Sequence, residues 1–278
     1  MTNSWLHCDV LSDAERLQVL DLINRTEQAI GREALDETRR RGVVHGWRAQ
    51  HWLRYDGDAL VQYAVLTEGE PPSLEVCGGG FDPSLRDAVL AIHPAVDWWI
   101  RHHPVTEGEI VRRLQVHSID MTPTAVSLPE GSLVRTFESG ADEEAWLTQN
   151  NAAFTDHPEQ GAWRMADLHS RIAEPWFDPS GFLLLEFDGK LAAACWTKVH
   201  ELYRERLGEI YVLSVAPDFQ GRGLGKTMLL LGLTTLRNKG VKRAILFVDA
   251  TNHPAIALYE SVGFRMERED YLVRFTNR

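Results

Sequence analysis

The sequence predicts a mixed α/β fold, with helices packed on a mixed sheet, built as two similar domains in tandem. Short apolar runs of strand length alternate with longer stretches of helical periodicity, above all in the second half. The length of 278 residues corresponds to about two domains of roughly 150 residues each. Around residues 122–132, Pro, Gly, Ser and Thr interrupt both periodicities. We therefore place the boundary near residue 130, which gives domains 1–130 and 131–278.

A hairpin and a third strand open the sheet of the second half. Apolar runs at 182–187 and 191–199 flank Asp188-Gly189, a dipeptide typical of two-residue hairpin turns. The next apolar run, at 209–215, is expected to be a strand. Alternation along it places its odd-numbered residues, beginning with Glu209, on one face and its even-numbered residues on the other.

Glycines and caps mark the rest of the second half. A glycine-rich loop at 220–225 leads into a helix that stops near Gly240. A buried strand at 244–250 follows. Asn252 is a suitable N-cap for a helix that Gly263 ends, and one or two strands close the chain.

The first half repeats this plan faintly. Residues 58–69 resemble the strands of a hairpin, 73–79 a strand before a loop, and 85–103 a helical region broken by a proline. An offset of about 136 residues separates Val76 from Val212, which points to an internal duplication.

The composition disfavours several classes of binding partner. Lys and Arg number 29 against 40 Asp and Glu, and the net charge of −11 disfavours nucleic acid and anionic membranes. No apolar run reaches the roughly 18 residues of a membrane span, and the start lacks the pattern of a signal peptide. The three cysteines form no CxxC pair, so we expect reduced thiols and no metal site. The expectation is a cytoplasmic, monomeric protein.

The loop QGRGLGKT (220–227) approaches two nucleotide-binding motifs and matches neither. A Walker A loop needs glycine where Gln220 stands, and the spacing of Gly221, Gly223 and Gly225 does not fit GxGxxG. Small residues nevertheless let backbone N–H groups approach an anion, at the positive end of the following helix. The pattern favours a pyrophosphate site over a turn without a ligand.

The motifs at 213–226, at Asn252 and at 257–264 (ALYESVGF) together resemble the GCN5-related N-acetyltransferase (GNAT) superfamily. The resemblance implies acetyl-CoA as cosubstrate, bound at the loop and along the preceding strand, without a metal. The cofactor-binding residues implied are Leu213, Ser214, Val215, Gln220, Gly221, Arg222, Gly223, Leu224, Gly225, Lys226, Asn252, Pro254, Ala255, Ala257 and Tyr259.

A narrower resemblance rests on FTDHPEQGAW (154–163), EPWFDPSG (174–181), WTKVH (196–200) and GEIYVL (208–213). Within the superfamily these segments are similar to the mycothiol synthases, which carry two such domains. The resemblance implies that the second small-molecule substrate is a Cys-glucosamine-inositol pseudodisaccharide, acetylated on its cysteinyl amine. It is strong over residues 133–278 and weak before them.

Acetyl transfer to an amine needs a base, and Glu209 is the candidate. A cysteinyl α-amine has a pKa of roughly 7.7–8.0, so a carboxylate suffices near neutral pH. The alternative for Glu209 is a solvated residue at a strand end. The resemblance implies that Tyr259 protonates the departing thiolate, although a tyrosine at this helical position could equally be a core residue. Cys195, in the apolar run AAACW, is interpreted as a buried thiol rather than a nucleophile.

The resemblance also implies the residues that bind the acceptor. Each of these residues could instead have a purely structural position. Glu159 could follow a turn at a proline, and Lys198 and Asp249 could be solvated. Glu33 could lie on an exposed face of the helical run EALDETRRR. The acceptor-binding residues implied are Glu33, Glu159, Lys198, Glu209 and Asp249.

The first domain departs from the family pattern. Its glycines, residues 78–80, come too early, and no RGxG precedes the helix. Asp87 is expected near the anion site, where its charge would oppose a pyrophosphate. We therefore predict a degenerate domain that does not bind acetyl-CoA productively and instead closes the acceptor site.

Three other functions stay open from the sequence alone. The same fold could acetylate another small amine. A non-catalytic acyl-CoA sensor would bind the cofactor without needing Glu209. A P-loop nucleotide module is suggested by Gly225-Lys226-Thr227 but lacks the required first glycine.

Overall fold

The computed structural model describes residues 4–101, 104–122, 125–155, 161–201 and 206–277, and it has the mixed α/β fold that the sequence predicts. The first half forms β1 (Leu6–Cys8), α1 (Asp13–Ile30), α2 (Glu37–His45), β2 (Gln50–Asp56), β3 (Ala59–Thr67), β4 (Ser73–Cys77), α3 (Pro83–Leu90), β5 (Ala95–Ile100) and β6 (Glu109–Asp120). The second half forms β7 (Ser132–Thr136), α4 (Glu143–Ala153), α5 (Met165–Ile172), the 3₁₀ turn η1 (Pro179–Gly181), β8 (Phe182–Phe187), β9 (Lys190–His200), β10 (Leu207–Val215), the 3₁₀ turn η2 (Pro217–Phe219), α6 (Leu224–Asn238), β11 (Arg243–Asp249), α7 (His253–Val262) and β12 (Arg265–Thr276).

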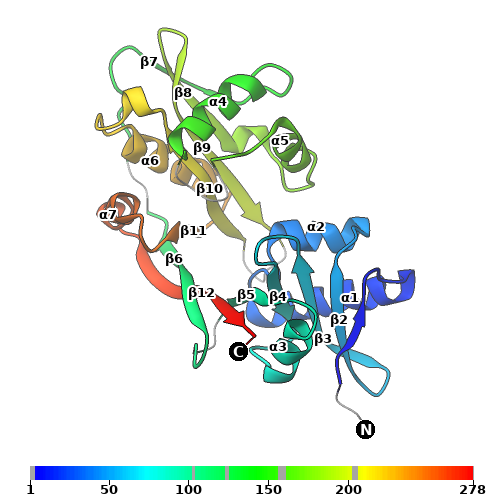
Figure 1. The fold of residues 1–278 in the computed structure, drawn as a ribbon. Helices are drawn as coiled ribbons and strands as arrows, with labels where there is room; N and C mark the ends of the chain where they lie inside the picture. Colours follow the sequence, from blue (N-terminus) through cyan, green and yellow to red (C-terminus); the bar gives the residue numbers. More distant parts are fainter. Residues whose placement is uncertain (1–3, 102–103, 123–124, 156–160, 202–205, 278) are drawn as a thin grey trace.

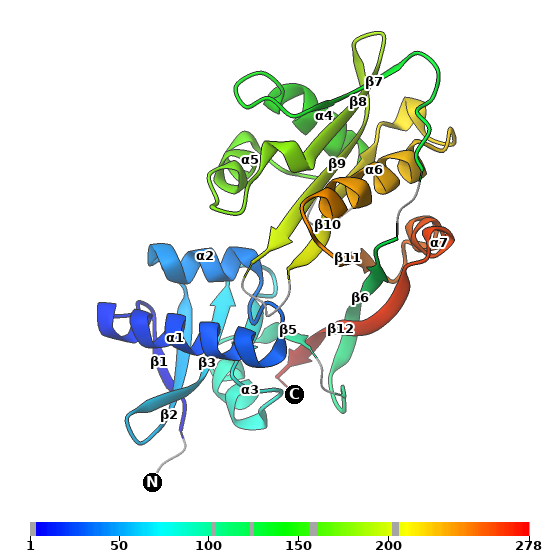
Figure 2. The ribbon, with the colours of Figure 1, turned by 180° about the vertical axis from the view of Figure 1, so that it is seen from behind.

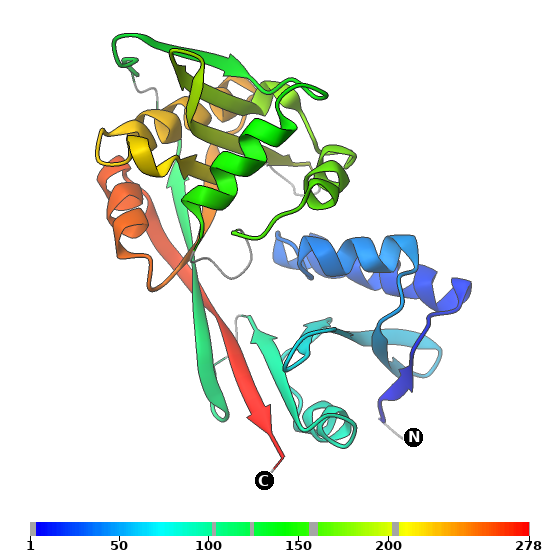
Figure 3. The same ribbon diagram turned by 45° about the horizontal axis from the view of Figure 1, so that its top comes forward.

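The strands of the described residues form one twelve-stranded sheet in which the two halves exchange their last strands. Its order is β1-β2-β3-β4-β5-β12-β6-β11-β10-β9-β8-β7. β12 therefore pairs with β5 of the first half, and β6 pairs with β11 of the second. β6 and β12 run antiparallel beside each other between the halves, as the green and red strands of Figures 1 and 3 show. The order reads the same from both edges, so β4 corresponds to β10, in agreement with the suspected duplication.

Helices cover both faces of the sheet in each half. In the first half, α1 and α2 pack on one face and α3 packs on the other. In the second half, α6 and α7 cover one face, and α4 and α5 the opposite face. Figure 2 shows α1 lying across β3 and α6 lying across β9 and β10. Each half thus has a core on each side of the sheet, which fixes the strand ends between the halves.

An aromatic core supports β9 and β10 from the α4 side. Trp146, Phe182 and Trp196 are fully buried, and the rings of Phe182 and Trp196 stack with centroids 4.4 Å apart. Tyr211 packs edge-on against Trp196, with centroids 5.2 Å apart. Full burial of one such side chain contributes about 1.5–3 kcal/mol. The strands that carry the candidate site therefore rest on a rigid layer.

The predicted turns and caps of the second half are confirmed. Asp188 and Gly189 have φ angles of 48° and 74°, as a type I′ hairpin turn requires. Asn252 caps α7 through its side chain, and Gly263 ends it in the left-handed conformation. Among the described residues, no helix combines the length and apolar character needed to cross a bilayer.

The face prediction for strand 209–215 is wrong because β10 contains a β-bulge. Its pairing with β9 shifts register between Ile210 and Val212. Ile210 consequently packs with the α6 core, whereas Val212 packs with the α4 core. The alternation of side chains along a strand cannot predict where a residue is inserted. Because of the bulge, Tyr211 and Val212 both pack with the α4 core.

Two predictions for the first half are also wrong. Residues 58–69 do not form a hairpin by themselves, because 59–67 is the single strand β3, whose partner is β2. The helix expected over 85–103 ends at Leu90, and 95–100 is the strand β5. β5 is buried on both faces, so its apolar run lacks the alternation that would distinguish it from a helix.

The strand exchange predicts that residues 131–278 do not fold alone. Because this fragment lacks both β5 and β6, the edge of β11 and the whole of β12 have no partner. We expect fragment 131–278 to aggregate or to unfold without a cooperative transition. Fragment 105–278, which keeps β6, should give a cooperative thermal transition by circular dichroism. A cooperative transition of 131–278 at the temperature of 105–278 would contradict this prediction.

Candidate active site

A cavity of about 650 Å³ lies where β10 and β11 diverge, beneath the α1–α2 connection of the first half. The two parallel strands pair only from Leu207↔Arg243 to Glu209↔Ile245, although both continue beyond. The backbone of β10 after Glu209 is therefore free of β11. Predicted site residues in the lining are Glu33, Lys198, Glu209, Leu213, Asp249, Asn252, Ala255 and Tyr259.

A charge cluster at one end of the cavity joins the two halves. The Lys198 ammonium, on β9, donates to Glu33 Oε1 at 3.1 Å and to Glu37 Oε2 at 3.2 Å. It also lies 4.7 Å from the centre of the Trp176 ring. Burial lowers the pKa of Lys198, but the charges of Glu33, Glu209 and Glu37 outweigh it and raise that pKa above its ordinary value.

The two first-half carboxylates respond differently to this lysine. Burial opposes ionisation of Glu33, but Lys198 and His200 hold the pKa of Glu33 below its usual range. Burial raises the pKa of Glu37 despite the same ammonium. Glu33 lies in the connection between α1 and α2, because α2 begins only at Glu37, so the alternative of an exposed helical face is wrong.

Glu209 lies beside Lys198 in the β9–β10 register and is only 7% exposed. Its Oε2 is 2.7 Å from Nε2 of His200, which is also buried. The alternative of a solvated glutamate at a strand end is therefore wrong. His200 belongs to the WTKVH segment (196–200), but no sequence pattern indicated a role for it.

The glycine-rich loop presents an open helix terminus near the other end of β10. α6 begins after Gly223, which has a φ of 78° and supplies no capping side chain. Gln220 donates to the carbonyl of Val215 at 3.3 Å, and Arg222 donates to that of Asp218 at 3.1 Å. The Lys226 amide donates to the Gly223 carbonyl, whereas no described residue accepts from the Leu224 and Gly225 amides, which are open to an anion.

Tyr259 lines the cavity from α7, and it is 9% exposed. Burial, together with Cys195, raises the pKa of Tyr259 above its ordinary value, so its hydroxyl keeps its proton near neutral pH. Cys195 is fully buried, as expected, and burial raises the pKa of its thiol to about 12.

The polar lining also includes side chains that the sequence did not indicate, among them Arg101, Arg112, Arg171 and Tyr211. Arg112 Nε donates to Asp249 Oδ2 at 2.8 Å, and Thr251 and Arg112 hold the pKa of Asp249 low against the opposing effect of burial. Arg171 Nε donates to the Tyr211 hydroxyl at 2.8 Å. Arg101, directly after β5, also lines the cavity. Arg112 lies in a strand with an ordinary charged pattern, so no sequence signal distinguishes it.

Residues 144–264 match the model of the acetyltransferase (GNAT) family. The mycothiol acetyltransferase of Streptomyces griseus is 38% identical over 96% of this chain and 94% of its own. That of Streptomyces coelicolor is 40% identical over 92% and 90%. The chain belongs to the mycothiol acetyltransferase family. It is therefore an N-acetyltransferase, which excludes the sensor and P-loop alternatives.

Solved structures agree with this fold over nearly the whole chain. A GCN5-related N-acetyltransferase from Sphaerobacter thermophilus gives a TM-score of 0.68 at 20% identity, covering 99% of this chain and 96% of that one. A tandem GNAT protein from the clavulanic acid pathway gives 0.69 at 15% identity, covering 99% and 98%. At such identities the likeness concerns the fold alone.

Not every predicted residue of this acetyltransferase lines the cavity. Ser214 is buried and donates to Gln149 Oε1 at 2.9 Å, so only its backbone can serve a ligand. Glu159 lies outside the described residues. The predicted cofactor residues that lie outside the cavity lining are Ser214, Val215, Gln220, Gly221, Arg222, Gly223, Leu224, Gly225, Lys226, Pro254 and Ala257.

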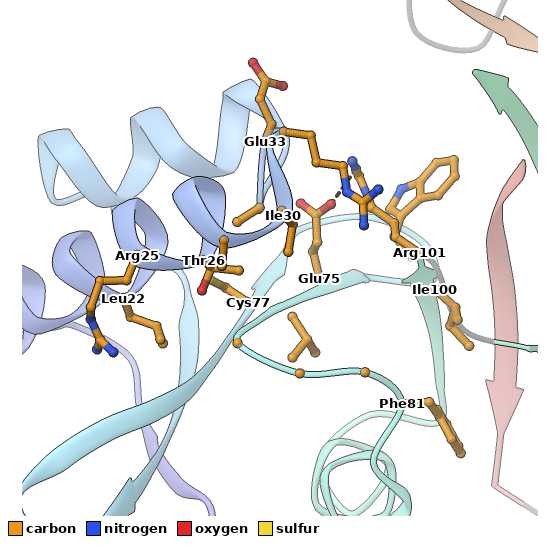
Figure 4. A pocket seen from close by; sticks show the side chains of 18 of the residues that line it. Leu22, Arg25, Thr26, Ile30, Glu33, Glu75, Cys77, Phe81, Ile100 and Arg101 are labelled. Carbon is orange, nitrogen blue, oxygen red and sulfur yellow. Dashed lines mark hydrogen bonds and ion pairs between the residues drawn. The ribbon is translucent and has the colours of Figure 1, made fainter. Parts of the chain in front are cut away.

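The first half has a counterpart cavity of about 450 Å³ where β4 and β5 diverge (Figure 4). Its lining includes the buried Glu75, which pairs with Arg101 at 2.5 Å. The corresponding helix, α3, is closed to anions at its start, because Asp82 accepts from the Ser84 amide at 2.8 Å. The opposing carboxylate is therefore Asp82; Asp87 lies farther along α3, beside Arg86.

Lys198→Met should lower the free energy of unfolding at pH 8 by about 3–5 kcal/mol, because it leaves buried carboxylates without their cation. The native lysine, with its raised pKa, is charged throughout the range below about 10.4. At pH 5 the deficit should shrink, because Glu37, with its raised pKa, can take up a proton. Urea unfolding at both pH values measures this.

The matched control is Lys190→Met, an exposed lysine on the same strand. The double variant Lys198→Met/Glu37→Gln should recover part of the loss at pH 8. A deficit for Lys198→Met that equals that of Lys190→Met would show that the cluster does not depend on its ammonium.

Proposed function

We propose that this protein transfers the acetyl group of acetyl-CoA directly to the cysteinyl amine of Cys-glucosamine-inositol, giving mycothiol in a ternary complex. The observation that carries the proposal is one cavity that holds a buried carboxylate, Glu209, and a buried phenol, Tyr259, at the diverging strands. The names of the relatives support the mycothiol assignment.

The arrangement around α6 fits acetyl-CoA. The uncapped first turn of α6, with Gln220–Lys226 around it, suits a pyrophosphate, because its N–H groups and helix dipole favour negative charge. The free edge of β10 at residues 213–215 would hydrogen-bond the pantetheine arm. Asn252, Pro254, Ala255 and Ala257, at the start of α7, would flank the same arm.

Glu209 would act as the base. The attacking nitrogen must be neutral, and an α-amine with a pKa of roughly 7.7–8.0 is largely protonated at neutral pH. Glu209 would accept that proton, directly or through one water. The neutral amine would then attack the thioester carbonyl, forming the C–N bond as the C–S bond breaks.

Tyr259 would donate its proton to the departing thiolate, since its raised pKa keeps the hydroxyl protonated. A backbone amide of residues 213–215 would stabilise the developing oxyanion. Direct transfer is favoured over an acyl-enzyme, because the Cys195 thiol is fully buried with a pKa near 12.

The acceptor would be held by groups from both halves. Glu33, Lys198 and Asp249 line the cavity with Glu209, and they can bind the hydroxyls and ammonium of a cationic polyol. Glu159 belongs to the same proposal. We assign the chemistry to residues 131–278 and the closing of the acceptor site to residues 1–130, whose helix α3 is capped by Asp82.

Glu209→Gln should lower kcat about 10²–10⁴-fold, because the amide cannot take the proton from the ammonium. The acetylated product is best measured by mass spectrometry, since this acceptor already carries a free thiol. Glu144→Gln, at an exposed carboxylate on α4, is the control and should be unchanged. If Glu209→Gln keeps most of the wild-type rate, Glu209 is not the base.

Tyr259→Phe should cost less, about 10- to 100-fold in the single-turnover rate, because a thiol with a pKa of about 8.5 leaves readily as thiolate. The affinity for acetyl-CoA should change little. Tyr271→Phe, on β12, serves as the control. A Tyr259→Phe enzyme with an unchanged single-turnover rate would mean that the thiolate obtains its proton elsewhere.

A further inference from the structure

We propose that His200 is a positioning residue that orients the Glu209 carboxylate for proton abstraction. This inference rests on the proposed role of Glu209 as base. Nothing in the sequence resemblance assigned a role to His200, although it stands two residues after Lys198 on β9.

The contact between the two side chains is short and buried. His200 Nε2 lies 2.7 Å from Glu209 Oε2, and the two residues are 8% and 7% exposed. A carboxylate has no proton to donate, so the imidazole N–H is the donor. With solvent excluded, this hydrogen bond to a charged acceptor is stronger than an exposed one.

A carboxylate of the first half also lies near the imidazole ring. His200 Nδ1 lies 3.6 Å from Glu33 Oε1, the same oxygen that accepts from the Lys198 ammonium. The ring therefore stands between one carboxylate from each half. Among the described residues, Glu33 and Glu209 lie against the ring, and Lys198 pairs with Glu33 and with Glu37 beside it.

The two carboxylate oxygens of Glu209 differ in their hydrogen bonds. Oε2 is engaged by His200, whereas no described residue donates a hydrogen bond to Oε1. Oε1 is therefore the oxygen available to the acceptor amine. Lys198 is the direct neighbour of Glu209 across β9 and β10, and it would attract a carboxylate that nothing else held. His200 keeps Glu209 from pairing with Lys198 and so keeps it available as a base.

The test compares two replacements of His200. His200→Gln retains a side-chain N–H of similar reach but cannot carry a proton through a ring. His200→Ala removes the donor. Because a misplacement of about 1 Å can cost roughly 10²-fold in rate, we expect His200→Ala to lower kcat about 10- to 100-fold with an unchanged KM for acetyl-CoA. His200→Gln should recover most of that loss. A Gln variant as slow as the Ala variant, or an Ala variant as fast as wild type, would overturn the proposal.

A double-mutant cycle separates positioning from an independent effect. In the Glu209→Gln background, His200→Ala should cause no further loss of kcat, because the base it orients is already absent. A second loss of the same size would overturn the proposal. If His200→Ala does not fold, as judged by circular dichroism, His200→Leu replaces it, keeping the volume without the donor. An active Glu209→Gln enzyme would instead refute the base itself, whatever the His200 variants show.

Discussion

A buried ammonium needs negative charge around it, and in this protein the negative charge comes from both halves of the chain. Lys198 is bound by Glu33 and Glu37 of the first half and lies beside Glu209 of the second. Neither half could bury these groups alone, because an unpaired buried charge is strongly destabilising. The candidate active site therefore exists only where the two halves meet.

The exchange of strands fixes that meeting point. β6 and β12 cross between the halves, so the diverging ends of β10 and β11 stay beneath the α1–α2 connection. The first half has the same divergence of its strands, but Asp82 occupies the start of its helix α3. We propose that it contributes a set of carboxylates to the site rather than a second acetyl-CoA site. On this proposal, a repeat that does not bind acetyl-CoA still serves the reaction.

Local patterns in the sequence predicted the elements from β8 onward well, because their turns and caps have distinct signals, whereas β7, α4 and α5 were not predicted. Asp188-Gly189 marked the hairpin, Asn252 and Gly263 marked α7, and the glycine loop marked the start of α6. The bulge at Tyr211, the short helix α3 and the exchange of β6 with β12 were missed. These depend on contacts between distant segments, which periodicity does not record. The resemblance brought Glu33, Lys198 and Glu209 together, whereas His200 and Arg112 became visible only through their partners in space.

The most direct test of this account is a crystal structure of the complex with CoA and the Cys-glucosamine-inositol acceptor. The measured quantity is the distance from the cysteinyl amine to the nearest Glu209 carboxylate oxygen. The account predicts about 3 Å, or a single bridging water, with Oε1 as the contacting oxygen and Oε2 still bound by His200. An amine beyond the reach of Glu209, or held by the cavity of the first half, would contradict it.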